Sequence, residues 1–555
     1  MPADSPARLK RQVRERKLSE RVLRLARQHR AALVVIGIML VAFLLRLHYL
    51  SKHTEHTADS YYFLILARSI RDTFTYMVRG VAHTKYLPGY PIMIWLGSYI
   101  FGDLARSANM IALLGGTFTA LATYGIGREL FNKWTGVVAA VVVAFQPTFL
   151  KWTVLSMTEG LFTFLFAAGV YLLLTGCKRA SPARRALGAA AGGLCFLVRW
   201  EGMLFLPIMG LIALIYIKDS KFRWWEPALA LFAFGAPMSV YVARNLIETG
   251  KVTSYVGEFK DYSTQVSYQV LKHRTKVYAW NGMSDALFSA LFFIGAAYCL
   301  ARRKWKGFLV AAGWFGIFVG FHLFWYYAYE RFMAPAVPAV GLIIGFMFVD
   351  MATLSWAFFS KARERESASP ARSAVLSGAR VACLVVLAAL LVTVVSHGLA
   401  RADLVIKQNY LAFADDHGGR GMEQAAGWLD RNARGETVAC DAGPYFRWLY
   451  YPGDVLYMRP VPWDLPVEPA DVTCQDAVRQ LNERGVRYIV IGQTEKGVDD
   501  ELGVFGIVGA YRSQIREVKR WVNHYDYPSP HDLTTVIFEI VLKSPTVERS
   551  DIEAR

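Results

Sequence analysis

Long apolar runs alternate with short polar segments along the first 400 residues of the chain. The first run, residues 31–50, is almost wholly apolar, with Arg46 near its far end. A helix needs roughly 20 residues to cross the hydrocarbon core of a bilayer. On this length rule we count about eleven candidate spans, near 31–50, 104–126, 134–149, 159–176, 186–199, 203–218, 226–246, 286–301, 307–325, 335–357 and 376–398. The pattern predicts a multi-pass α-helical membrane protein with about eleven transmembrane helices.

Basic residues indicate the orientation of these spans. The tail 1–30 is rich in Arg and Lys, and no small-residue cleavage site follows the first run, so we expect a retained first helix and a cytoplasmic N-terminus. With eleven spans, the basic loops all fall on that same side: 178–185, 218–223, 302–306 and 361–372. The sequence therefore predicts a protein of the cell membrane whose remaining loops, and everything after about residue 398, face outward.

The segment 399–555 is water-soluble in composition. Helix-like stretches alternate there with strand-like stretches, which is typical of a small α/β domain with a partly parallel sheet. The helix-like stretches are 422–431 and 475–483, and the strand-like ones are 436–441, 488–492 and 534–541. We expect three parts: a tail 1–30, a membrane domain 31–398 with a first outer loop at 51–103, and an extracytoplasmic domain 399–555. Without a Gly-rich phosphate motif, the last part is interpreted as a lid or an acceptor-docking domain.

Composition agrees with a membrane protein. Hydrophobic residues make up 54% of the chain and charged residues only 19%, which disfavours a large soluble enzyme. The net charge of +18 lies largely in the tail and the basic loops, so it indicates contact with membrane lipids and no nucleic-acid partner. Cys440 and Cys474 share the predicted outer domain, where a disulfide and two separate thiols are both open.

Ionisable residues concentrate in the first outer loop. Asp59 precedes an amphipathic helical pattern, where a carboxylate can cap the helix or act as a general base. Three cations fall at predicted outer helix ends or loops: Lys85, Arg244 and Arg331. Such cations suit a phosphate, although Lys and Arg at helix ends also serve as interfacial anchors.

These residues resemble, in order, the motifs of the GT-C superfamily of membrane glycosyltransferases. The likeness is to the glycosyltransferase 39, protein-mannosyltransferase and aminoarabinose-transferase branch. The matching segments are Leu45-Arg46-Leu47, Asp59 with Tyr61-Tyr62, Lys85 with Pro88-Gly89-Tyr90-Pro91, Thr158-Glu159, Arg199-Trp200-Glu201-Gly202, Arg244-Asn245 and Tyr329-Glu330-Arg331-Phe332. The resemblance covers nearly the whole chain.

The resemblance implies transfer of a sugar from a polyprenyl-phosphate donor to an acceptor hydroxyl of a lipid, glycan or protein, at the outer face, with inversion. Asp59 is then the base, and Lys85, Arg331 and Arg244 hold the donor phosphate. The residues expected to contact substrate are Tyr61, Tyr62, Tyr90, Glu159, Tyr329 and Glu330.

One departure concerns metal. Many family members carry two adjacent acids in this loop, whereas Ser60 follows Asp59 here. His53, Glu55 and His56, with His83 nearby, offer imidazole and carboxylate ligands for a divalent metal. A solvated loop without metal is the alternative, and no other cofactor is indicated.

Two further functions stay open. An oligosaccharyltransferase-like enzyme fits Asp59-Ser60-Tyr61-Tyr62, but the Trp-Trp-Asp acceptor motif is absent, and Trp224-Trp225-Glu226 falls on the cytoplasmic side. A transporter or flippase of lipid-linked sugars fits the number of spans. The sequence shows neither internal repeats nor acids in the middle of a span, which are typical of transporters.

Overall fold

The fold is described from a computed structural model of the chain. The structure describes residues 30–51, 58–78, 81–253, 267–281, 286–325, 329–365, 370–417, 420–440, 455–457, 481, 483–494, 515–525 and 531–541. The chain divides into two compact units. Unit 1 comprises residues 1–52 and 66–405, and unit 2 comprises 53–65 and 406–555. The division falls inside two helices, α2 (Ala58–Thr73) and α17 (Pro370–His417).

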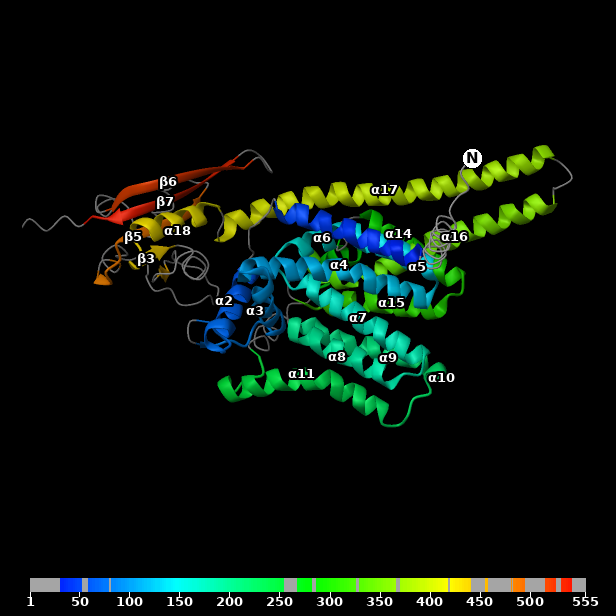
Figure 1. Ribbon diagram of the computed structural model, residues 1–555, viewed down its shortest axis with the longest axis horizontal. Helices are drawn as coiled ribbons and strands as arrows, with labels where there is room; N and C mark the ends of the chain where they lie inside the picture. Colours follow the sequence, from blue (N-terminus) through cyan, green and yellow to red (C-terminus); the bar gives the residue numbers. More distant parts are fainter. Residues whose placement is uncertain are drawn as a thin grey trace, which may run out of the picture. The chain divides into compact units, whose positions relative to one another are not determined.

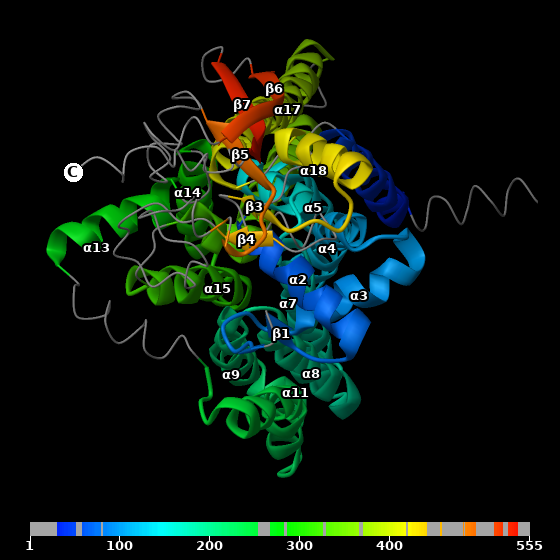
Figure 2. The ribbon, with the colours of Figure 1, turned by 90° about the vertical axis from the view of Figure 1, so that its left-hand side faces the viewer.

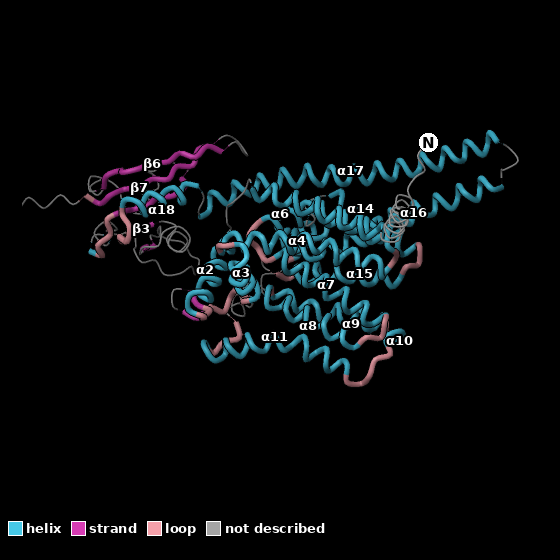
Figure 3. Tube along the Cα trace, viewed as in Figure 1, coloured by secondary structure: helices cyan, strands magenta, loops and turns pink. Residues whose placement is uncertain are grey.

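Unit 1 is helical (Figures 1 and 3). It begins with the helix Arg30–Ser51. The helices and helical turns that follow are α2 (Ala58–Thr73), α3 (Gly89–Phe101), α4 (Leu104–Leu130), α5 (Lys133–Phe145), α6 (Pro147–Val154), α7 (Glu159–Lys178), α8 (Pro182–Val198), η1 (Trp200–Leu204), α9 (Phe205–Ile215), α10 (Ile217–Ser220), α11 (Glu226–Thr249), α13 (Tyr268–Thr275), η2 (Lys276–Asn281), α14 (Ala286–Ala301), α15 (Trp305–Leu323), η3 (Glu330–Ala336), α16 (Val337–Arg365) and α17 (Pro370–His417). A short antiparallel hairpin, β1 (Met77–Val78) and β2 (Val81–Ala82), joins α2 to α3.

Seven helices in the described residues are long and apolar enough to cross a membrane, or eight if one bent pair counts as a single span. This multi-pass architecture was predicted, but the count of about eleven is not confirmed. The runs predicted at 186–199, 203–218 and 286–301 form α8, α9 and α14, of 17, 11 and 16 residues. Helices of this length reach or fall below the lower limit for a full crossing, which is about 17 residues.

The run predicted at 134–149 is broken. α5 and α6 are bent by 58° where they meet at Gln146. The side chain of Gln146 accepts a hydrogen bond from the Phe149 amide at 2.6 Å, and Pro147 occupies the first turn of α6. A polar cap followed by proline starts a new helix because proline has no amide hydrogen to donate to the helix before it.

Small residues let α4 and α7 pack closely. A Cβ built on Gly160 would overlap the carbonyl oxygen of Ala112, and a Cβ on Gly115 would fall 2.6 Å from the carbonyl oxygen of Gly160. Glycine at such crossings allows two helix backbones to approach each other. This contact fixes the N-terminal end of α7, where Glu159 lies.

Unit 2 contains a five-stranded sheet in the order β4-β3-β5-β7-β6. Its strands are β3 (Val438–Cys440), β4 (Val455–Tyr457), β5 (Tyr488–Thr494), β6 (Ile515–Tyr525) and β7 (His531–Ile540). β3 pairs in parallel with β4 and β5, and β7 pairs antiparallel with β5 and β6. Helix α18 (Arg420–Asn432) contributes Met422, Ala425 and Leu429 to the same core as Val438 and Val490.

The segments predicted at 422–431, 436–441, 488–492 and 534–541 overlap α18, β3, β5 and β7. β6 was not predicted, because its sequence is rich in charged and polar residues and has no apolar run, although the Pro-containing segment 526–530 that follows it is a turn signal. The helix predicted at 475–483 lies mostly outside the described residues, as does Cys474, so the choice between a disulfide and two separate thiols stays open. Cys440 is buried in β3.

Candidate active site

Lys85 lies on the polar segment 76–88, here called the loop of Lys85, which contains the β1–β2 hairpin. Inside this loop the His83 amide donates to the Tyr76 carbonyl at 3.0 Å, and the Tyr76 hydroxyl donates to the Tyr86 carbonyl at 3.0 Å. The Tyr86 amide in turn donates to Nε2 of His83 at 3.1 Å, and the two rings stack with centroids 5.5 Å apart. These bonds close the loop on itself on both sides of Lys85.

Arg244 of α11 binds this loop through its backbone (Figure 2 shows the hairpin beside α8 and α11). Its Nη1 donates to the His83 carbonyl at 2.8 Å, and its Nη2 donates to the Tyr76 carbonyl at 2.8 Å. Nη1 also donates to Oδ1 of Asn245 at 3.0 Å. Arg244 therefore joins α11 to the two residues that flank the hairpin, Tyr76 and His83.

Three further side chains fix the backbone next to Lys85. The Tyr241 hydroxyl and the Thr253 hydroxyl donate to the Thr84 carbonyl at 3.1 and 3.0 Å. Nε1 of Trp200 donates to the Lys85 carbonyl at 3.2 Å. Since Trp200 begins η1, the position of Lys85 is tied to the turn that follows α8.

His83 is neutral in this environment. Burial lowers its pKa to about 4, and the nearby charges of Lys85 and Arg244 act in the same direction. A neutral ring is consistent with the bond that Nε2 accepts from the Tyr86 amide, because a protonated Nε2 could not accept it. This nitrogen is therefore occupied within the loop, which leaves it unavailable as a metal ligand in this arrangement.

A buried group of charges lies where α7, α8 and η1 meet. Arg199, at the C-terminal end of α8, donates Nη1 to Glu159 Oε1 at 2.6 Å and to the Thr158 hydroxyl at 3.0 Å. Its Nη2 and Nε donate to the two carboxylate oxygens of Glu201 at 2.6 and 3.3 Å. The Glu159 side chain is fully buried, and those of Arg199 and Glu201 are 11% and 12% exposed. One guanidinium thus holds two carboxylates inside the helical unit.

His322, near the end of α15, approaches the same group. Its Nε2 lies 3.6 Å from Glu201 Oε1, and its Nδ1 lies 2.8 Å from the Phe318 carbonyl oxygen. His322 therefore joins α15 to the charge group at Glu201.

Arg331 lies in η3, the turn before α16. Its guanidinium carbon lies 5.7 Å from the Trp152 ring centroid and 5.4 Å from that of Phe332. The Phe332 ring also contacts Arg199, at 5.7 Å, and stacks on His322 with centroids 5.0 Å apart. Through Phe332, the turn that carries Arg331 packs on the buried charge group.

Glu330, the neighbour of Arg331, forms an ion pair with Lys151 of α6 at 2.6 Å. The Lys151 side chain is 8% exposed and that of Glu330 is 29% exposed. This pair ties η3 to α6 and so gives Arg331 a second attachment to the helical unit.

The remaining predicted site residues differ in burial and in the unit to which they belong, and the Tyr329 ring contacts Arg331, with 5.6 Å from its centroid to the guanidinium carbon. Asp59 lies in the first turn of α2 and is half-buried; it belongs to unit 2, whereas Lys85, Arg244 and Arg331 belong to unit 1. The other residues predicted to contact substrate divide into buried Tyr61 and Tyr90, half-buried Tyr62, and half-exposed Tyr329. The Tyr90 hydroxyl donates to the Ala108 carbonyl at 2.8 Å.

The predicted metal ligands His53, Glu55 and His56 lie outside the described residues. Within the described ranges, no group of three or more His, Cys, Asp or Glu side chains could hold a metal ion.

Sequence reasoning missed Lys151, and it did not assign roles to Glu201 or His322. Lys151 and His322 each interrupt an otherwise apolar run. Ionisable residues inside such runs are costly to bury, and they mark functional or structural charge pairs. This signal could have singled them out before the structure.

Part of the chain matches the model of a known protein family. A family model described as dolichyl-phosphate-mannose-protein mannosyltransferase matches residues 83–241, which include Lys85, Glu159, Arg199 and Glu201. None of the curated proteins compared matches the chain.

Solved structures share the fold at low identity. ArnT from Cupriavidus metallidurans in the apo state is 12% identical with a TM-score of 0.56, over 91% of this chain and 97% of that one. The same protein bound to undecaprenyl phosphate has a TM-score of 0.55 at 12% identity, over 92% and 98% of the two chains. The Archaeoglobus fulgidus oligosaccharyltransferase tethered with an acceptor peptide has a TM-score of 0.51 at 12% identity, over 90% and 74%.

The chain therefore shares the fold of ArnT and of the Archaeoglobus fulgidus oligosaccharyltransferase, and residues 83–241 match the mannosyltransferase family model, in line with the sequence resemblance.

Proposed function

We propose that this enzyme transfers a sugar from a polyprenyl-phosphate donor to an acceptor hydroxyl at the outer face of the cell membrane. The observation that carries this proposal is the anchoring of Lys85 and Arg331. Both cations lie on turns attached to one buried charge group, Lys85 through Trp200 and Arg331 through Phe332. Rigid cations suit a leaving phosphate because they need little reorganisation as negative charge develops.

In the proposed reaction the acceptor oxygen attacks C1 of the sugar while the bond from C1 to the phosphate oxygen breaks. The acceptor proton passes to Asp59, and polyprenyl phosphate leaves with its charge held by Lys85 and Arg331. A single displacement of this kind inverts the anomeric centre. The N-terminus is then cytoplasmic, and residues 399–555 form the outer domain.

Arg244 has a different role in this proposal from the one the sequence suggested. Three of its hydrogen bonds go to the loop backbone and to Asn245. We therefore assign Arg244 to positioning the loop of Lys85, and only indirectly to the donor phosphate. Glu159, fully buried and bonded to Arg199, is assigned to the same supporting group.

The test is sugar transfer by the full-length protein in nanodiscs, with a radiolabelled polyprenyl-phosphate sugar. Lys85→Met and Arg331→Met should each lower kcat by roughly 10²–10³, the scale for removing one charge-stabilising group. Lys221→Met, at an exposed turn after α10, is the matched control and should transfer at the wild-type rate. Wild-type rates for both site variants would refute the phosphate-binding assignment.

An oligosaccharyltransferase-like activity is the second candidate, supported by the fold shared with the Archaeoglobus fulgidus enzyme. A parallel assay with a lipid-linked oligosaccharide and an acceptor peptide separates the two. Transfer to the peptide, with none from a polyprenyl-phosphate monosaccharide, would favour this alternative.

A further inference from the structure

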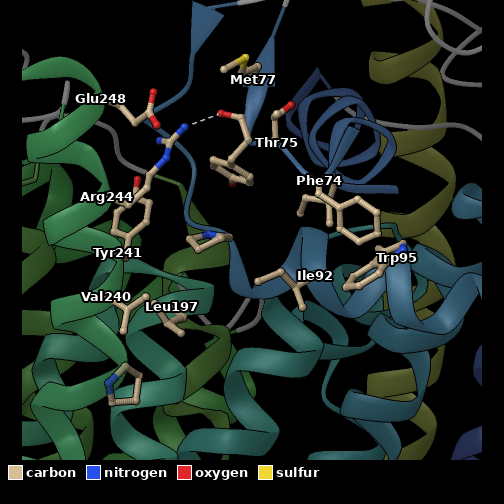
Figure 4. A pocket seen from close by; sticks show the side chains of 14 residues that line it. Phe74, Thr75, Met77, Ile92, Trp95, Leu197, Val240, Tyr241, Arg244 and Glu248 are labelled. Carbon is tan, nitrogen blue, oxygen red and sulfur yellow. Dashed lines mark hydrogen bonds between the residues drawn. The ribbon is translucent and has the colours of Figure 1, made fainter. Parts of the chain in front are cut away.

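A cavity of about 600 Å³ lies in unit 1 between the end of α2, the hairpin, α3, α8 and α11 (Figure 4). Most of its wall is apolar, with Ile92 and Trp95 from α3 facing Leu197 of α8 and Val240 of α11. A volume of this size is typical of sites for small organic ligands. The cavity is separate from the buried charge group around Arg199, none of whose members lines it.

The polarity of the cavity changes in order along α11. Pro237, Val240, Arg244 and Glu248 all line it, and spacings of three and four residues place them on one face of the helix. The sequence of environments is therefore apolar, then cationic, then anionic. Figure 4 shows the same order, from Val240 through Arg244 to Glu248.

In the described residues, Arg244 and Glu248 form no ion pair with each other. Arg and Glu four residues apart on a helix are neighbours that commonly pair, yet the guanidinium of Arg244 is directed to the carbonyls of Tyr76 and His83. Arginine has five N–H donors, and the three bonds described above leave two of them. In the part of the chain that the structure describes, Glu248 forms no hydrogen bond or ion pair.

Exposed apolar side chains surround the opening. Phe74 and Val240, which line the cavity, are 79% and 72% exposed, and neighbouring Ile247 is 82% exposed. Exposed apolar patches of this kind mark sites of contact with a membrane or another partner. The opening of the cavity is therefore apolar, with its charged end one helical turn further along α11.

We propose that this cavity binds an aminophospholipid. Its hydrocarbon chain lies against Leu197, Pro237 and Val240, its phosphate accepts from the two remaining N–H groups of Arg244, and its ammonium group pairs with Glu248. The order chain, phosphate, ammonium in such a lipid is the order of environments along α11. Arg244 and Glu248 are about 6 Å apart along the helix axis, from four residues at about 1.5 Å each, which is a head-group-sized interval.

Other amphiphiles match this order less well. Polyprenyl phosphate has an anion and an apolar chain but no cation for Glu248. A cationic amphiphile without phosphate would leave the two remaining N–H groups of Arg244 without an anion. The zwitterion satisfies both groups, and its binding does not depend on the proposed sugar transfer.

The experiment is a lipid titration of the full-length protein in a neutral detergent, with bound lipid counted by native mass spectrometry. The probes are phosphatidylethanolamine, phosphatidylglycerol and undecaprenyl phosphate. We expect one phosphatidylethanolamine to bind more tightly than phosphatidylglycerol. Glu248→Gln should weaken that binding roughly tenfold to hundredfold, which corresponds to about 1.5–3 kcal/mol for a hydrogen bond to a charged group. The same variant should bind undecaprenyl phosphate as tightly as the wild type.

Two pairs of variants separate the site from general effects. Val240→Trp fills the cavity and should abolish the tight phosphatidylethanolamine site, whereas Leu231→Trp, on α11 outside the cavity and 57% exposed, should not. Glu248→Asp keeps the charge and should retain most of the binding. Wild-type phosphatidylethanolamine binding in both Glu248→Gln and Val240→Trp would overturn the proposal. The proposal would also be overturned if Val240→Trp lost binding of undecaprenyl phosphate but kept binding of phosphatidylethanolamine. That result would assign the cavity to the polyprenyl chain.

Discussion

The guanidinium of Arg199 lies 2.6 Å from a carboxylate oxygen of Glu159, and 40 residues of chain separate the two. Glu159 is the first residue of α7 and Arg199 directly follows α8, so the pair joins the N-terminal end of α7 to the C-terminal end of α8. Both side chains are inside the helical unit, where each charge would be costly without the other. The turns that carry Trp200 and Phe332 pack around this pair, which makes it the structural base of the candidate site.

Arg199→Met should therefore be strongly destabilising. The substitution leaves the carboxylates of Glu159 and Glu201 buried without their cation, and the expected loss of unfolding free energy is about 3–5 kcal/mol. The measurement is the midpoint of thermal unfolding in detergent. The control is Arg106→Met, which removes an exposed pair with Asp103 whose side chains are 70% and 58% exposed, and should change stability by less than about 1 kcal/mol. Equal midpoints for both variants would show that the buried group is not structural.

The crossing of α4 and α7 gives a second prediction. Gly160→Ala adds a methyl group that overlaps the carbonyl oxygen of Ala112, so it should cost about 1–3 kcal/mol of unfolding free energy. Gly316→Ala on α15 is the matched control, since nothing lies within 4 Å of a Cβ there. That variant should be neutral or gain up to about 1 kcal/mol from helix propensity. The measurement is the unfolding midpoint of each variant and of the wild type. A wild-type midpoint for Gly160→Ala would contradict the close packing of α4 and α7.

The loop of Lys85 should be sensitive to acid. The pKa of His83 is about 4 in the folded loop and about 6.5 in an unfolded chain, so the unfolded loop binds a proton first as pH falls. Neutral His83 makes its full contribution to the free energy of unfolding above about pH 6.5. This contribution, on the order of 3 kcal/mol, is lost as the pH falls from about 6.5 to 4.

Hydrogen exchange of the peptide covering residues 76–88, corrected for the intrinsic pH dependence, measures this loss. His83→Gln keeps an acceptor for the Tyr86 amide but does not titrate, so protection in that variant should be independent of pH over this range. An identical pH dependence in wild type and His83→Gln would remove His83 as the cause.

Much of the helical architecture could be predicted because hydropathy and length are local properties. The helices α4, α7, α11, α15 and α16 lie at or overlap runs found by counting apolar residues. The break at Gln146 could also have been inferred, since a polar residue before Pro147 is a helix-start signal. It was missed because the residues before Gln146 are almost all apolar, and the run length alone suggested one span over 134–149.

The candidate site could be predicted only as a set of residue types. The sequence singled out Lys85, Arg244 and Arg331 as outward cations, but it contains no information on which groups each contacts. The backbone bonds of Arg244 and the pairing of Lys151 with Glu330, 179 residues apart, arise from tertiary packing. The role of Asp59 rests on its place in the first outer loop and on family resemblance, and it stays a prediction.

Sugar transfer by Asp59→Asn tests the central claim most directly. The substitution keeps the size of the side chain and removes its capacity to accept a proton, so kcat should fall by roughly 10²–10⁴, the range for losing a general base. Donor binding and the unfolding midpoint should stay at wild-type values. A wild-type rate of transfer from a polyprenyl-phosphate sugar by Asp59→Asn would contradict the proposed mechanism.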